Sequence, residues 1–125
     1  MSMSNASETA LLNLLFNNTD WANVGDAAGL QNSAAAGSFY VALHTADPTD
    51  AGNQTTSEAS YTGYARVAVA RTGGGWTVSG NQVSNTATVQ FGECTAGSAT
   101  VTHFSVGLLA SGAGDILYSG ALSAS

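Results

Sequence analysis

The sequence contains no lysine, and its two fixed positive charges are Arg66 and Arg71. Charged residues make up 8% of the 125 residues, against about 25% in an ordinary domain, and the net charge is -6. Two arginines cannot neutralise a run of phosphates, so the composition argues against general nucleic-acid binding. The lack of a basic cluster also excludes a polybasic contact with a membrane.

Cysteine is almost as scarce, because Cys94 is the only one. A single cysteine cannot form an internal disulfide, and together with the two histidines it lacks the spacing of a zinc site. The most apolar stretch, 11–16, is too short to span a membrane, and no basic segment precedes it as in a secretory signal. We therefore expect no metal, no cofactor and no membrane contact, and synthesis in the cytoplasm.

Residues for catalysis are also few. A Ser-His-Asp site needs a nucleophile, a base and an acid within hydrogen-bond reach, but His44 and His103 stand in no nucleophile motif. Serine and threonine are abundant enough to fall near a histidine by chance. Asp47, Asp50 and Asn53 carry oxygen ligands for a cation but do not follow the EF-hand pattern. We expect hydrogen-bonded structural histidines and a protein that is not an enzyme.

Small residues dominate the composition instead of charged ones, since Ala, Gly, Ser and Thr account for 66 of the 125 residues. A disordered chain would lack the Val, Leu, Phe, Tyr and Trp residues that are interleaved with them at regular spacing. The pattern therefore favours many short strands whose outward faces carry hydroxyl groups. Such surfaces suit contact with other subunits, because few charges must be desolvated.

The first segment is predicted to be a helix that ends at 17–20. Asn5 followed by Glu8 has the spacing of a capping box. Apolar residues recur every three or four positions and form one face, which Leu12 and Phe16 widen. Such a face usually covers one side of the main fold. The alternative is that it docks onto a partner subunit.

Alternating apolar and polar residues predict six or seven strands after this helix. The strands are expected at 38–44, 64–70, 76–79, 82–85, 86–91, 101–108 and 116–122. In the first, Phe39, Val41 and Leu43 alternate with the other face, which predicts a half-buried strand. Gly80-Asn81 predicts a type II′ hairpin turn.

A long exposed loop is expected at 49–60. Strands at spacings near ten residues predict an all-β fold, a single antiparallel β-sandwich that is jelly-roll-like or Greek-key. A short N-terminal α-helix precedes it. We expect one domain overall, with an N-terminal helix or arm at 1–20 and the β-sandwich at 21–125.

Several segments give the chain a resemblance to a known family. They are FYVALHTADP at 39–48, YTGYARVAV at 61–69, WTVSGN at 76–81, VTHF at 101–104 and ILYSGAL at 116–122. With the N-terminal helix before them, they resemble a family of small tailed-phage virion proteins. Members are often labelled tail fibre proteins, and some act as capsid decoration or cement proteins. The resemblance covers nearly the whole chain and implies a structural, non-enzymatic role in the virion.

The resemblance leaves two places in the virion open. The chain has no heptads or shaft repeats, which a standalone fibre would need for length. This favours a capsid decoration or cement protein on the capsid surface, which oligomerises with itself and binds the major capsid protein. The alternative is a tail-fibre or receptor-binding accessory module. In either case we expect synthesis in the bacterial host cytoplasm.

The expected partner interface consists of apolar residues of the N-terminal region together with the two arginines. Arginine is favoured in interface ion pairs, so both are expected to pair with acidic groups, within the chain or across a subunit boundary. The interface residues predicted in this way are Leu11, Leu12, Leu15, Phe16, Trp21, Arg66 and Arg71.

Overall fold

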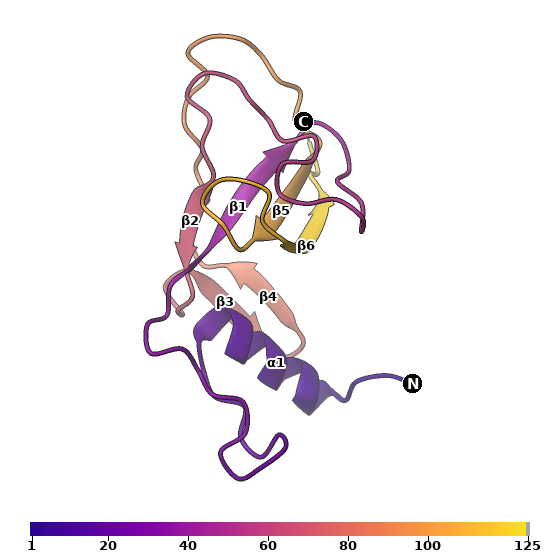
Figure 1. Cartoon of the computed structure of the whole chain (residues 1–125), viewed down its shortest axis with the longest axis vertical. Helices are drawn as coiled ribbons and strands as arrows, with labels where there is room; N and C mark the ends of the chain where they lie inside the picture. The colour runs from indigo at the N-terminus through magenta and orange to yellow at the C-terminus, as the bar shows by residue number, and fades with distance from the viewer. Residues whose placement is uncertain (125) are drawn as a thin grey trace. The chain divides into compact units, whose positions relative to one another are not determined.

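The computed structural model of the chain describes residues 1–124 (Figure 1). It has one helix, α1 (Asn5–Asn17), and the strands β1 (Ser38–His44), β2 (Val67–Ala70), β3 (Trp76–Ser79), β4 (Gln82–Asn85), β5 (His103–Gly107) and β6 (Ile116–Ala121). The strands form a four-stranded sheet, in the order β2-β1-β5-β6, and a two-stranded β3-β4 sheet. Both sheets are antiparallel. This confirms the predicted all-β class with a short N-terminal helix, and it is consistent with a small β-sandwich.

The structure divides into two compact units. The first comprises residues 1–38 and 70–88, and holds α1 with the β3-β4 sheet. The second comprises residues 39–69 and the chain from residue 89 onward, and holds the four-stranded sheet apart from the end residues of β1 and β2. The division does not decide whether the chain is one domain with an arm at 1–20, so this stays a prediction.

Helix α1 has a cap at each end. The Ser4 side chain accepts a hydrogen bond from the Ser7 N–H, so the cap lies one residue before the predicted Asn5. Asn18 adopts a left-handed conformation, with φ 50°, and ends the helix as predicted. The helix has 13 residues, against about 20 needed to cross a bilayer. Among residues 1–124, no helix is long and apolar enough to do so.

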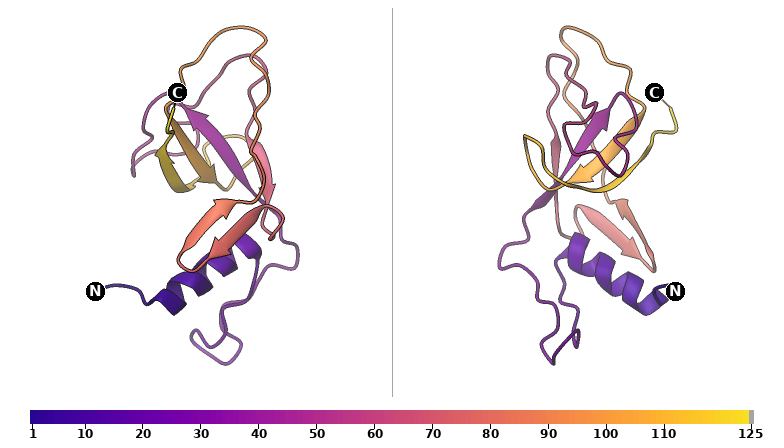
Figure 2. Two further views of the ribbon diagram at one scale, coloured as in Figure 1. Left: turned by 180° about the vertical axis from the view of Figure 1, so that it is seen from behind. Right: turned by 45° about the vertical axis from the view of Figure 1, so that its right-hand side comes forward.

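The core of the first unit lies between α1 and the β3-β4 hairpin, which run side by side (Figure 2). Phe16 is 1% exposed and meets Trp76 edge to face, with ring centroids 4.9 Å apart. Leu12 is buried on the same helix. Thr9 Oγ1 donates to the carbonyl of Gly80 at 2.7 Å, and the φ of Gly80, 61°, agrees with the predicted type II′ turn. Burying a side chain of the size of Phe16 contributes ~1.5–3 kcal/mol.

Strand β1 runs through the middle of the four-stranded sheet. Phe39 and Val41 are buried as predicted, but Ala42 and His44 on the opposite face are fully buried too. The prediction of a half-buried strand is therefore wrong for the second half of β1. The reason is that the loop at 49–60 packs against this second face instead of extending into solvent.

Two of the predicted strands differ from the structure. No strand forms at 86–91, where the Thr86 N–H donates to the carbonyl of Gly75 at 2.9 Å and continues the end of the hairpin. The strand predicted at 64–70 begins only at β2, because the Tyr64 N–H donates to a carbonyl three residues earlier in a turn. Alternation alone does not form a strand when the segment finds no neighbouring edge to pair with.

Candidate functional site

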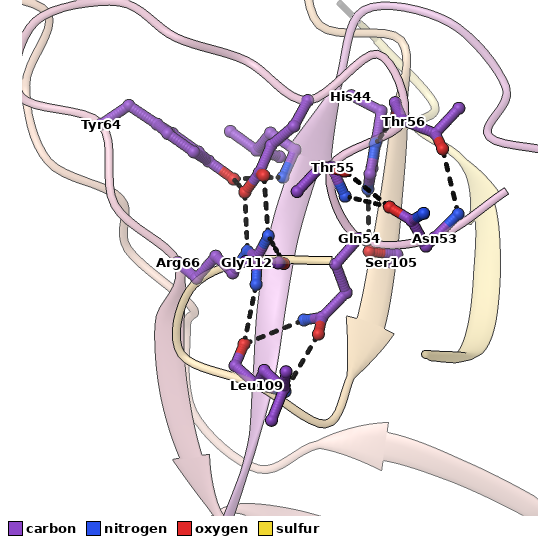
Figure 3. Close-up of polar contacts among 12 residues, drawn as sticks. His44, Asn53, Gln54, Thr55, Thr56, Tyr64, Arg66, Ser105, Leu109 and Gly112 are labelled. Carbon is purple, nitrogen blue, oxygen red and sulfur yellow. Dashed lines mark hydrogen bonds and ion pairs between the residues drawn. The ribbon is translucent and has the colours of Figure 1, made fainter. Parts of the chain in front are cut away.

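A cluster of polar side chains in the second unit joins the long loop after β1 to the β5-β6 connection (Figure 3). Glu58 and Arg66 form a bidentate ion pair, with Nε–Oε1 2.7 Å and Nη2–Oε2 2.8 Å. The same guanidinium donates to the carbonyls of Leu109 at 2.9 Å and Gly112 at 2.8 Å. The side chain of Arg66 is 3% exposed and that of Glu58 16%. One arginine therefore connects the loop, the start of β2 and the β5-β6 connection.

Tyr64 extends the cluster to the central strand. Its hydroxyl donates to Glu58 Oε1 at 2.8 Å and accepts from the Leu43 N–H at 3.1 Å. Burial raises the pKa of Glu58, but the hydrogen bonds from Arg66 and Tyr64 outweigh it, so the net pKa of Glu58 lies below its ordinary value. The bond to Glu58 raises the pKa of Arg66, and burial raises that of Tyr64. The carboxylate and the guanidinium are consequently both charged at neutral pH.

Gln54 also connects the long loop after β1 to the β5-β6 connection. Its side-chain amide pairs with the backbone of Leu109, donating to the carbonyl at 3.1 Å and accepting from the N–H at 2.9 Å. Its side chain is fully buried, and a Cβ added at Gly107 or Gly114 would overlap its amide group. Both glycines are needed for this close approach. The prediction that the loop at 49–60 is exposed is therefore wrong at its centre.

His44 and Ser105 form a buried pair beneath the loop. His44 Nδ1 lies 2.7 Å from the Thr56 carbonyl, and Nε2 lies 2.8 Å from Ser105 Oγ. Because a carbonyl only accepts, Nδ1 carries a proton, and Nε2 pairs with the Ser105 hydroxyl. This is the order of a nucleophile and its base, but both residues are 0% exposed. His103, the cross-strand partner of His44, bonds to the Thr102 hydroxyl, so the predicted hydrogen bonding of both histidines is confirmed.

An open groove of about 420 Å³ lies beside the ion pair. Its lining combines aromatic rings, the paired charges and small residues of the β5-β6 connection, among them Glu58, Tyr61, Tyr64, Arg66, Ala110 and Ser111. The volume falls within the range of small-molecule sites, about 300–1,000 Å³.

Packing and hydrogen bonds hold the rings of the groove in place. Tyr61 and Tyr64 meet edge to face, with centroids 5.5 Å apart. Tyr64 also stacks on Phe91 at 6.0 Å, with the planes 6° from parallel. The Tyr61 hydroxyl donates to the Gly92 carbonyl at 2.9 Å. The aromatic wall is therefore largely fixed before any ligand arrives.

Two of the three loop residues considered as cation ligands accept hydrogen bonds from within the loop. Asp47 Oδ1 accepts from the Thr49 N–H, and Asn53 Oδ1 accepts from the N–H and the hydroxyl of Thr55. Over residues 1–124, no three His, Cys, Asp or Glu side chains are grouped to hold a metal ion.

The apolar residues predicted for the partner interface lie in different surroundings. Leu12 and Phe16 are buried inside the first unit, whereas Leu11, Leu15 and Trp21 are half-buried. The accessible part of the predicted apolar set is therefore confined to these last three. As an interface, the set stays a prediction.

The two arginines of the predicted interface lie in different units. Arg66 has the acidic partner that the sequence led us to expect, and it lies within the chain. Arg71 donates to the carbonyls of Leu14 at 2.8 Å, Leu15 at 2.6 Å and Ala36 at 3.0 Å. The last carbonyls of a helix have no partner within it, and they carry partial negative charge. Arg71 therefore stabilises the C-terminal end of α1.

Sequence reasoning did not single out Gln54, Glu58 or Tyr64. In a chain with two arginines, a search for the acid nearest Arg66 leads to Glu58, eight residues earlier. Gln54 gives no such signal, because a glutamine among Asn, Thr and Ser resembles any exposed loop residue.

Comparison with known protein families matches the chain to a family described as podophage GP4 fiber I protein gp80, over residues 2–125. Comparison with curated proteins and with solved structures gives no match. The family match covers the helix, both sheets and the polar cluster described above.

Proposed function

The chain belongs to the podophage GP4 fiber I protein gp80 family, a family of tailed-phage virion structural proteins, and from this premise we propose that it serves as a module of a tail fibre. The observation that carries the proposal is the match to a fibre protein over residues 2–125. The sequence favours a capsid decoration protein because it lacks shaft repeats. A fibre assembled from several modules does not need a shaft in each, so this absence is equally compatible with a fibre module.

The proposed role is binding without catalysis. The only Ser-His pair described above has no exposed surface, and a general base must reach the proton that it removes. The low charge of the chain reduces the cost of desolvating its surface against another protein. These features support a module that acts through contacts with other subunits.

We propose that those subunits include further copies of this chain. Leu108 and Leu109, at the end of β5, are 43% and 48% exposed. Exposed apolar side chains that lie together often mark a protein contact. The half-buried Leu11, Leu15 and Trp21 of the first unit form a second proposed contact. Substitution of single residues tests that contact better than deletion of 1–20, because deletion would also expose Trp76 by removing Phe16.

The proposal is tested by adding the purified protein to separated heads and tails of virions that lack it. A fibre module should bind to the tails and restore adsorption to host cells, and it should leave the heads bare. A capsid decoration protein should coat the heads and should raise their resistance to heat or chelation. Coating of heads without binding to tails would overturn the fibre proposal.

A further inference from the structure

We propose that the groove beside Glu58 and Arg66 binds an uncharged saccharide. This inference rests on the proposed fibre function, because it assigns a ligand to a module that is exposed on the virion tail. Three features support it: the aromatic rings that line the groove, the unused acceptor site of Glu58, and the charge of the surroundings.

The aromatic wall offers the apolar contact that a sugar ring needs. One face of a sugar ring carries mainly C–H groups, and tyrosine provides a rigid amphipathic surface with little conformational entropy to lose. The edge-to-face contact with Tyr61, the stack on Phe91 and the bond from Leu43 all fix Tyr64. The Tyr61 hydroxyl is anchored on the Gly92 carbonyl. The rings therefore need little ordering on binding, which favours affinity.

The ion pair retains hydrogen-bonding capacity at the groove. A carboxylate has about four acceptor sites, and that of Glu58 accepts three bonds, two from Arg66 and one from Tyr64. A guanidinium has five N–H donors, and that of Arg66 makes four bonds. One acceptor site of Glu58, whose side chain is 16% exposed, remains for a ligand, and Ser111 adds a hydroxyl to the lining of the groove. The fifth N–H of Arg66 is not counted, because that side chain is only 3% exposed. Neighbouring hydroxyl groups of a sugar both donate and accept, so they match this set.

The charges around the groove favour a ligand without net charge. Glu58 neutralises Arg66, the chain has no lysine, and its net charge is -6. Arg71, the other arginine, is not among the residues that line the groove. A phosphorylated or carboxylated sugar would find no free cation in the groove, and the overall field would repel it. The open groove of about 420 Å³ suits a terminal sugar or a short stretch of a polysaccharide.

The test titrates the full chain with methyl glycosides of neutral hexoses and N-acetylhexosamines, and with methyl glucuronide as the anionic comparator. Ligand-observed NMR detects weak binding, and amide chemical shifts locate it. The expected result is binding of at least one neutral glycoside with shifts at Tyr61 and Tyr64, and weaker binding of the glucuronide. Binding of no neutral glycoside, or stronger binding of the glucuronide, would overturn the inference.

Substitutions in the groove show whether a loss of binding comes from the lost ring contact or from a loss of folding. Tyr61→Ala should weaken binding about tenfold, which corresponds to about 1.4 kcal/mol of lost ring contact, while Tyr61→Phe should retain most of it. Ala110→Trp places a large ring in the groove and should abolish binding. Tyr118→Ala removes an exposed tyrosine outside the groove and is the matched control. Binding that survives both Tyr61→Ala and Ala110→Trp would overturn the inference.

The same variants distinguish failure of this inference from failure of the fibre proposal. If virions carry the chain on the tail but Tyr61→Ala and Ala110→Trp both leave glycoside binding unchanged, the groove assignment is wrong and the fibre proposal stands. If Ala110→Trp instead abolishes binding to other tail proteins, the groove is a protein contact and the saccharide inference is wrong. If the chain occupies the capsid, the fibre proposal itself is wrong.

Discussion

Replacing Arg66 with methionine should destabilise the second unit by about 3 kcal/mol. Methionine keeps much of the side chain's length but removes the charge, so the carboxylate of Glu58 loses two bonds and the carbonyls of Leu109 and Gly112 lose a donor each. Breaking a buried pair by removing one partner costs about 3–5 kcal/mol, against about 0–1 kcal/mol for an exposed pair. Because the side chains of Arg66 and Glu58 are 3% and 16% exposed, we expect a cost at the lower end of the range for buried pairs, about 3 kcal/mol.

The measurement is urea unfolding followed by far-UV circular dichroism, with amide hydrogen exchange to locate the loss. Trp21 and Trp76 both lie in the first unit, so tryptophan fluorescence would not report directly on this change. Arg66→Lys keeps the charge but loses the planar fork, and it should destabilise less than methionine does. The double variant Glu58→Gln with Arg66→Met should recover part of the loss, because it leaves no unpaired carboxylate. A free energy of unfolding for Arg66→Met within about 0.5 kcal/mol of the wild type would refute the reasoning, since that is the range of ordinary surface substitutions.

Three further changes follow from the same contacts. Gln54→Leu should cost about 1–3 kcal/mol, because the Leu109 N–H loses its acceptor, while the Leu109 carbonyl keeps the bond from Arg66. Hydrogen exchange of the Leu109 amide no faster than in the wild type would contradict this. Phe16→Ala should destabilise the first unit by about 3–5 kcal/mol, and tryptophan emission should shift to the red because Trp76 becomes exposed to water. Leu30→Ala, at an exposed site, is the control and should have little effect. The folded pKa of Glu58 lies below its ordinary value of 4.5, so its stabilising contribution is fully present above pH 4.5 and is lost as the pH falls through the lower folded pKa. Acid titration of stability should therefore be flatter in Glu58→Gln than in the wild type, and equal slopes below pH 4.5 would exclude this role.

Local sequence patterns predicted the elements whose signals lie within a few residues. Helix α1 ends at Asn18 because a short polar residue tolerates the left-handed conformation there. The β3-β4 hairpin follows from Gly80, whose positive φ the turn requires. Both features depend on neighbours in the chain, so one sequence is enough to find them.

The parts that the sequence did not predict depend on partners far along the chain. The stretch at 86–91 alternates like a strand, but no edge lies beside it to complete a ladder. Gln54 is buried because Gly107 and Gly114, more than fifty residues away, leave room for its amide. No local pattern encodes such a contact.

The candidate site was predictable in one respect. The scarcity of cations predicted that Arg66 would be paired, and its partner is Glu58. The aromatic wall was missed, because Tyr61, Tyr64 and Phe91 meet only when the loop and the segment after residue 89 fold together.

The fibre assignment is tested most directly by an asymmetric cryo-electron microscopy reconstruction of the intact virion, compared with one from a phage that lacks this chain. We expect the density lost in the difference map to lie on the tail and to accommodate both units of the structure. Lost density confined to the capsid shell would contradict it.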